Sequence, residues 1–109
     1  MDILKHLDEV LEQRKNADHN SSYVSKLYSK GLDSILKKIA EEAGEVIMAS
    51  KDAQYTNNTQ NITYEIADLW FHSLILLHQY GLSSQDVINE LNKREGLSGI
   101  LEKQQRSPQ

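Results

Sequence analysis

Two apolar segments with the periodicity of amphipathic helices each carry a pair of carboxylates at helical spacing. Glu42 and Glu45 are three residues apart in the first segment, and Glu65 and Asp68 are three apart in the second. Residues three or four apart share one face of a helix, so each pair projects from one side. If the two helices lie antiparallel, four or five carboxylates converge and repel one another unless a cation lies between them. This pattern predicts a divalent-metal site inside a helical bundle.

The first part of the chain predicts two helices joined by a polar loop. An apolar stripe begins at Ile3, and the helix that carries it ends in the turn-forming residues 16–20. Ser22, together with the serine before it, is placed to cap a short second helix, which Gly31 ends. The first helix carries no recognisable chemistry and is interpreted as a packing element. On the second, Lys26 and Lys30 lie four residues apart and form either a solvated cationic edge or a pair that faces the acidic centre and holds a phosphate.

The two central helices follow, and they hold the acidic pairs. Asp33 or Ser34 is predicted to start the first of them, and Asp52, with the lysine before it, marks its end. Thr59 or Asn61 is predicted to cap the second, which runs on to a glycine at position 81. The acidic pair of the second helix borders its apolar stripe, a placement that puts carboxylates at a cleft between helices.

The remaining residues complete an all-α prediction. Ser83 and Asp86 have the spacing of a capping box ahead of a fifth helix, which Gly96 ends, and residues 96–109 read as a loosely ordered tail. The predicted fold is a bundle of about five helices around two central antiparallel helices, forming one domain over residues 1–109. The second central helix is apolar nearly all round, which so small a monomer cannot cover, so a homodimer is expected.

Composition excludes several classes of function. The chain has no cysteine, so disulfides, thiolate metal sites and thiol nucleophiles are excluded. Its formal net charge of −4 provides no basic field to attract nucleic acid. The longest apolar run, 74–77, is too short to cross a membrane, and the N-terminus lacks a signal-peptide pattern. We therefore expect a cytoplasmic protein that binds neither nucleic acid nor membrane.

The predicted metal ligands are all hard oxygen donors. They are Glu42, Glu45, Glu65 and Asp68. Such a set favours Mg²⁺, with Mn²⁺ as an alternative, and a Mg²⁺ ion held by carboxylates completes its shell with substrate phosphates. The predicted chemistry is hydrolysis of a phosphate ester or anhydride, with Glu41 or Glu42 helping to deprotonate the attacking water. The sequence leaves open which carboxylate is the base and how many metal ions bind.

Four basic residues are candidates for binding the phosphates of a substrate. They are Lys26, Lys37, Lys38 and Arg94. Arg94 is favoured because a guanidinium binds phosphate in bidentate fashion. For the lysines the alternatives are a solvated surface or pairing with Glu41 and Glu42 one turn away.

Two histidines lie in the second central helix. His72 is one turn after Asp68 and shares an edge of the helix with it, so it is interpreted as orienting the Asp68 carboxylate. His78 has no such partner nearby in the sequence and is given no role.

The acidic motifs resemble those of a known superfamily. Glu-Glu-x-x-Glu beginning at Glu41, followed by Glu-x-x-Asp at Glu65, is the motif of the MazG-type all-α nucleotide pyrophosphatases. The additional pairs Ser22-Tyr23 and Lys37-Lys38 narrow the resemblance to the branch of this superfamily that acts in histidine biosynthesis. From about residue 4 to about residue 94 the chain resembles phosphoribosyl-ATP pyrophosphohydrolase of histidine biosynthesis.

This resemblance implies hydrolysis of the α–β phosphoanhydride of phosphoribosyl-ATP, giving phosphoribosyl-AMP and pyrophosphate. It assigns metal binding to the four ligands predicted above, with Glu41 beside them, and it implies a dimer or larger assembly. Many organisms fuse this domain to phosphoribosyl-AMP cyclohydrolase, and this chain is expected to be the stand-alone pyrophosphohydrolase. Two alternatives stay open. The same motif occurs in house-cleaning nucleoside triphosphate pyrophosphatases, and the acidic residues could instead be the solvated surface of a non-catalytic helical interaction module.

Overall fold

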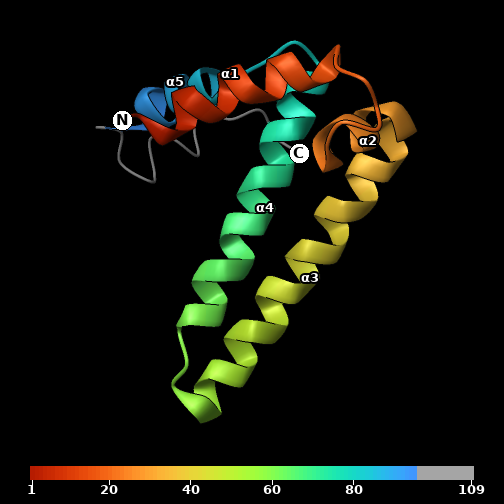
Figure 1. Cartoon of the computed structure of the whole chain (residues 1–109). Helices are drawn as coiled ribbons and strands as arrows, with labels where there is room; N and C mark the ends of the chain where they lie inside the picture. The colour runs from red at the N-terminus through yellow and green to blue at the C-terminus, as the bar shows by residue number, and fades with distance from the viewer. Residues whose placement is uncertain (96–109) are drawn as a thin grey trace, which may run out of the picture.

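The computed structural model describes residues 1–95, which form five helices and no strand within that range. The helices are α1 (Ile3–Lys15), α2 (Tyr23–Lys30), α3 (Leu32–Thr56), α4 (Gln60–Gln79) and α5 (Ser84–Arg94). Helices α3 and α4 form a long antiparallel hairpin, and α1, α2 and α5 gather at the end where α3 begins and α4 finishes (Figure 1). The predicted all-α class with two central antiparallel helices is confirmed. The predicted tail from residue 96 lies outside the described residues.

Most of the predicted helix ends are confirmed. The Ser22 side chain accepts a hydrogen bond of 3.0 Å from the backbone N–H of Ser25 at the start of α2. Gly31 separates α2 from α3 with φ of 98°, a left-handed conformation that costs glycine far less than any residue with a Cβ. Ser83 and Asp86 form the predicted capping box of α5. These caps fix where the chain turns around the end of the hairpin.

Helix α3 is longer than predicted at both ends. It starts at Leu32, directly after the turn, and it continues past Asp52 to Thr56. Its end is set by Asn57, which has φ of 59° and donates its backbone N–H to the carbonyl of Ala53. Asparagine tolerates this left-handed conformation better than most residues, so the stop signal lies there and not in the earlier polar residues.

The start of α4 also differs in detail. Thr59 occupies the N-cap position but makes no capping hydrogen bond through its side chain, and Asn61 already lies inside the helix. The side chain of Asn58 accepts instead from the backbone N–H of Gln60 at 3.1 Å, as in an Asx turn. The connection between the two central helices is therefore a tight polar turn.

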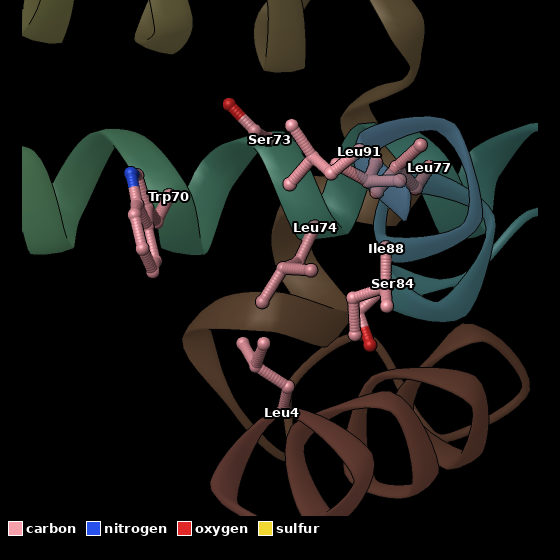
Figure 2. Close-up of a pocket in the computed structure, with 9 residues that line it drawn as sticks. Leu4, Trp70, Ser73, Leu74, Leu77, Ser84, Ile88 and Leu91 are labelled. Atoms are coloured by element: carbon pink, nitrogen blue, oxygen red, sulfur yellow. The ribbon is translucent and has the colours of Figure 1, made fainter. Parts of the chain in front are cut away.

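The apolar core lies where α1, α2, the start of α3 and the end of α4 meet. Its buried members are Leu11, Val24, Leu27, Ile35, Leu74 and Ile75. Trp70 belongs to the apolar periodicity of α4, which predicts burial, but 59% of it is exposed. It lines an apolar groove of about 210 Å³ between α1, α4 and α5, where it projects from α4 on the same side as Leu74 (Figure 2). The part of the hairpin beyond Glu42 on α3 and before His72 on α4 has no buried apolar side chain.

A buried polar network that the sequence did not reveal joins α1 to α4 and α5. The His78 ring is 2% exposed, with Nε2 2.7 Å from Asp8 Oδ1 and Nδ1 2.7 Å from Glu12 Oε1. Ser84, the first residue of α5, donates its hydroxyl and its backbone N–H to Asp8. Lys15 donates to the carbonyl of His78 at 2.9 Å. His78 was assigned no role because these partners lie more than 60 positions away in the sequence.

This network makes the fold sensitive to acid. Burial of Asp8 disfavours its charge, but hydrogen bonds from Ser84 and His78 outweigh that effect and lower its pKa. The hydrogen bond with His78 is the largest cause of the lowered pKa of Glu12. A carboxyl with a lowered pKa in the folded state stabilises the fold above its unfolded pKa, and that stabilisation is lost as the pH falls through the folded value. We expect the free energy of unfolding to decline as the pH falls below about 4.

The measurement is urea denaturation between neutral and strongly acidic pH. Asp8→Asn should lower the free energy of unfolding at neutral pH by about 1–3 kcal/mol, since it replaces one of the two acceptor oxygens and removes the charge that strengthens the hydrogen bonds from Ser84 and His78. It should also flatten the decline in acid. Asp52→Asn, a matched change at an exposed position of α3, should follow the wild type at every pH. A variant at Asp8 that keeps both the stability and the acid response of the wild type would contradict this account.

No helix among the described residues is long and apolar enough to be a candidate membrane span.

Candidate active site

The acidic residues of both motifs lie on the facing helices of the hairpin. Glu41, Glu42 and Glu45 are on α3, and Glu65 and Asp68 are on α4. Only Glu42 is fully buried, at 5% exposed, while Glu65 and Asp68 are half-buried and the other two are exposed. Antiparallel packing of α3 on α4 therefore brings carboxylates from two distant parts of the sequence to one region between the helices.

These carboxylates are close enough to raise one another's pKa. The pKa of Glu42 is raised, first by burial and then by the charges of Asp68 and Glu45, which outweigh the opposing effect of His72. The pKa of Glu65 is raised first by a hydrogen bond shared with the Glu45 carboxyl, then by burial and by the other carboxylates. Burial and the neighbouring carboxylates thus both disfavour negative charge on these two residues, and a bound cation would oppose both effects.

Two oxygens of this group are buried and accept no hydrogen bond of ordinary geometry from any described residue. They are Glu65 Oε2 and Glu42 Oε1, the second of which has His72 Nδ1 beside it at 2.6 Å. A buried polar atom without a partner is rare in native structures and calls for an ion or a water. Carboxylate oxygens are the ligands that Mg²⁺ and Mn²⁺ prefer, so the residues present fit such an ion. Within residues 1–95 no group of three or more acidic or histidine side chains is close enough together to hold a metal ion as the side chains stand.

His72 contacts a different acid from the one predicted. Its Nδ1 lies 3.0 Å from the backbone carbonyl of Asp68 and 2.6 Å from Glu42 Oε1. The interpretation that it orients the Asp68 carboxylate is therefore corrected, because the ring lies back over the preceding turn of α4 and meets only the backbone there. Its other nitrogen, Nε2, is 2.8 Å from the hydroxyl of Tyr23 on α2.

A polar pocket of about 340 Å³ lies between α2 and the first half of α3, and Glu41 is the one of the five carboxylates that lines it. It is lined by Tyr23, Leu27, Lys30, Ser34, Lys37, Lys38 and Glu41. Lys37 and Lys38 were among the predicted phosphate-binding residues, and Lys30 was considered beside Lys26 as a residue that could face the acidic centre, whereas Ser34 was expected only to start a helix. The signal for Ser34 was the sharp turn at Gly31, which folds α2 back beside α3. Lys38 Nζ lies 3.8 Å from Glu41 Oε2, so Lys38 pairs with Glu41 and not with Glu42 as the sequence suggested.

The other two candidate phosphate-binding residues lie elsewhere. Lys26 is exposed on α2 and does not line this pocket. Arg94 is at the end of α5, where its Nε donates to Glu90 Oε1 at 3.2 Å. A role for either side chain in binding phosphate stays a prediction.

Comparison with known proteins agrees with this arrangement. Residues 4–95 match the family described as phosphoribosyl-ATP pyrophosphohydrolase. A phosphoribosyl-ATP pyrophosphatase of Hydrogenovibrio crunogenus is 60% identical over 106 residues, covering 97% of this chain and 94% of the relative. Proteins of the same name from a Janthinobacterium species and from Neisseria meningitidis serogroup B are 55% and 50% identical, each over 105 residues, covering 94% and 96% of this chain and 93% and 94% of the relatives. The chain belongs to the phosphoribosyl-ATP pyrophosphohydrolase family.

Proposed function

We propose that this chain hydrolyses the α–β phosphoanhydride of phosphoribosyl-ATP to phosphoribosyl-AMP and pyrophosphate, an early step of histidine biosynthesis, with Mg²⁺ as its cofactor and Mn²⁺ as a substitute. The names of its relatives support the substrate. One observation supports the chemistry above all: Glu41, which lines a pocket together with three lysines, directly precedes Glu42, whose buried carboxylate oxygen accepts no hydrogen bond of ordinary geometry. A polyphosphate bound to a divalent cation needs this juxtaposition of acidic and basic groups.

Glu42, Glu45, Glu65 and Asp68 are the proposed metal ligands. When bound, the cation neutralises phosphate charge and lowers the pKa of a coordinated water. Glu41 is the proposed proton acceptor, because it lies at the edge shared by the lysine pocket and the carboxylates and is not needed as a ligand. Glu42 stays the alternative base, since its raised pKa also suits that role.

The lysine pocket is proposed to hold the polyphosphate chain. Lys30, Lys37 and Lys38 would neutralise the charge that develops on the leaving pyrophosphate, and the Ser34 hydroxyl can donate to a phosphate oxygen. In the reaction the water oxygen forms a bond to phosphorus and its proton passes to the carboxylate. The anhydride P–O bond breaks, and pyrophosphate leaves with the electron pair.

Pyrophosphate release from phosphoribosyl-ATP, ATP and a deoxynucleoside triphosphate tests this function. We expect Mg²⁺-dependent release from phosphoribosyl-ATP, abolished by EDTA and restored by Mg²⁺ or Mn²⁺. The two simple triphosphates should react at least 100-fold more slowly, since they lack the phosphoribosyl group that the site would recognise. Comparable rates on those triphosphates would indicate a house-cleaning pyrophosphatase, and no release from any of the three would support a non-catalytic module.

We also propose that the chain acts as a homodimer, and as a cytoplasmic protein in keeping with its lack of cysteine. Several large apolar side chains are exposed on the hairpin: Ile47, Met48, Tyr55, Tyr64 and Trp70. The outer part of the hairpin has only its two helices to cover its apolar faces, and a helix pair alone cannot bury both sides. A second hairpin packed against the first would complete a four-helix arrangement.

A further inference from the structure

Tyr23 and His72 connect three helices at the edge of the carboxylate cluster, and the proposed function assigns neither of them a role. Tyr23 is on α2, His72 is on α4, and the carboxylate next to the ring belongs to Glu42 on α3. The His72 ring is 5% exposed, as is Glu42. Side chains so fully enclosed have few alternative rotamers, so their relative placement is a fixed property of the fold.

The hydrogen bonds of the ring determine which nitrogen carries the proton. The backbone carbonyl of Asp68 can only accept, and it lies 3.0 Å from Nδ1, so Nδ1 is the protonated nitrogen. In the neutral ring Nε2 is then an acceptor, and its partner at 2.8 Å is the Tyr23 hydroxyl. Burial is the largest cause of the raised pKa of Tyr23, so this hydroxyl keeps its proton and donates. The tautomer and the ring orientation are thus both held by protein groups.

The rings are also packed edge to face. The centroid of Tyr23 lies 5.8 Å from that of His72 at an interplanar angle of 84°, and Phe71 contacts the same ring at 5.5 Å and 87°. Aromatic pairs favour this arrangement. The imidazole cannot rotate without losing a hydrogen bond at each nitrogen, and Glu42 Oε1, 2.6 Å from Nδ1, lies against its fixed edge.

We propose that Tyr23 and His72 are positioning residues for Glu42, with Tyr23 acting through His72 to hold this carboxylate in place for the divalent cation. The inference rests on the proposed function, since it assumes that Glu42 is a metal ligand. Tyr23 also lines the lysine pocket. One helix, α2, therefore borders the proposed phosphate site and also helps to orient Glu42. Groups that orient a ligand from behind typically contribute 10- to 100-fold to metal affinity or activity.

Single variants test the contributions of Tyr23 and His72 to metal binding separately. Tyr23→Phe removes one hydroxyl and keeps the packed ring, so we expect Mn²⁺ affinity, measured by titration of free Mn²⁺ with electron paramagnetic resonance, to fall about fivefold. His72→Leu removes both ring nitrogens and should lower the affinity about 10- to 100-fold. His72→Asn keeps a donor near the position of Nδ1 and should recover part of that loss. Tyr28→Phe, which removes another hydroxyl of α2, is the matched control and should bind Mn²⁺ as the wild type does.

The double variant Tyr23→Phe/His72→Leu provides the decisive comparison. If Tyr23 acts through His72, the double variant binds Mn²⁺ no more weakly than His72→Leu alone. In steady-state kinetics with phosphoribosyl-ATP, Tyr23→Phe should lower kcat with little change in KM. Additive losses in the double variant, or a Tyr23→Phe effect confined to KM, would overturn the proposal and make Tyr23 a substrate contact. Wild-type Mn²⁺ affinity in both single variants would also overturn it. Failure of the proposed function is distinguishable, because the wild type itself would then release no pyrophosphate.

Discussion

Replacing Glu42 by glutamine is expected to lower kcat for pyrophosphate release from phosphoribosyl-ATP at least 100-fold while leaving the metal-free protein as stable as the wild type or more so. The loss of activity follows from losing a charged ligand at the centre of the carboxylate group. The stability follows from the raised pKa of Glu42, which means that its charge is disfavoured in the metal-free fold by burial and by neighbouring acids. Opposite effects on activity and stability are typical of functional sites.

Thermal unfolding with and without Mn²⁺ measures both consequences on one sample. The wild type should gain melting temperature as Mn²⁺ is added, because a ligand that binds only the folded state stabilises it, and Glu42→Gln should lose most of that gain. Glu9→Gln, a matched change at an exposed glutamate of α1, should retain full activity and the full Mn²⁺ response. If Glu42→Gln kept its Mn²⁺ response and its kcat, the metal site would have to lie elsewhere.

The parts of this molecule that local sequence encodes were predictable. Helix caps depend on residues within one turn, so Ser22, Gly31 and the capping box at Ser83 could be read directly. The same holds for the spacing of carboxylates along one helix, which brought the two acidic pairs to attention. The end of α3 was predicted too early, at Asp52. The helix continues through the residues that follow and ends only before Asn57, which adopts the left-handed conformation.

Contacts between distant segments were not predictable in the same way. His78 was dismissed, yet it lies between Asp8 and Glu12 of the first helix. His72 was assigned to the acid one turn away, whereas the fold places it against Glu42. In both cases the partner is chosen by how helices pack across the core, and nothing in the spacing along one helix encodes that choice.

The exposure of Trp70 is the difference that bears most on assembly. An apolar periodicity marks a face that is buried, but it does not say whether the same chain or another copy buries it. Trp70 lines the same groove as Leu74 and Leu91, and 59% of the residue is accessible in the single chain (Figure 2). A tryptophan on an exposed apolar rim is typical of an interface anchor.

Trp70→Glu is therefore expected to raise the dissociation constant of the proposed homodimer at least 100-fold, since it removes an aromatic anchor and would place a charge in an apolar contact. Sedimentation velocity at micromolar concentration should give twice the chain mass of 12.5 kDa for the wild type and the single-chain mass for the variant. Tyr80→Glu, a matched change at an exposed aromatic that does not line the groove, should stay dimeric. Ile47→Glu tests the exposed face of α3 separately. A wild type that sediments as a single chain would exclude the dimer. If Trp70→Glu stays dimeric and Ile47→Glu becomes monomeric, the interface lies instead on the outer hairpin, where apolar side chains of α3 and α4 are exposed.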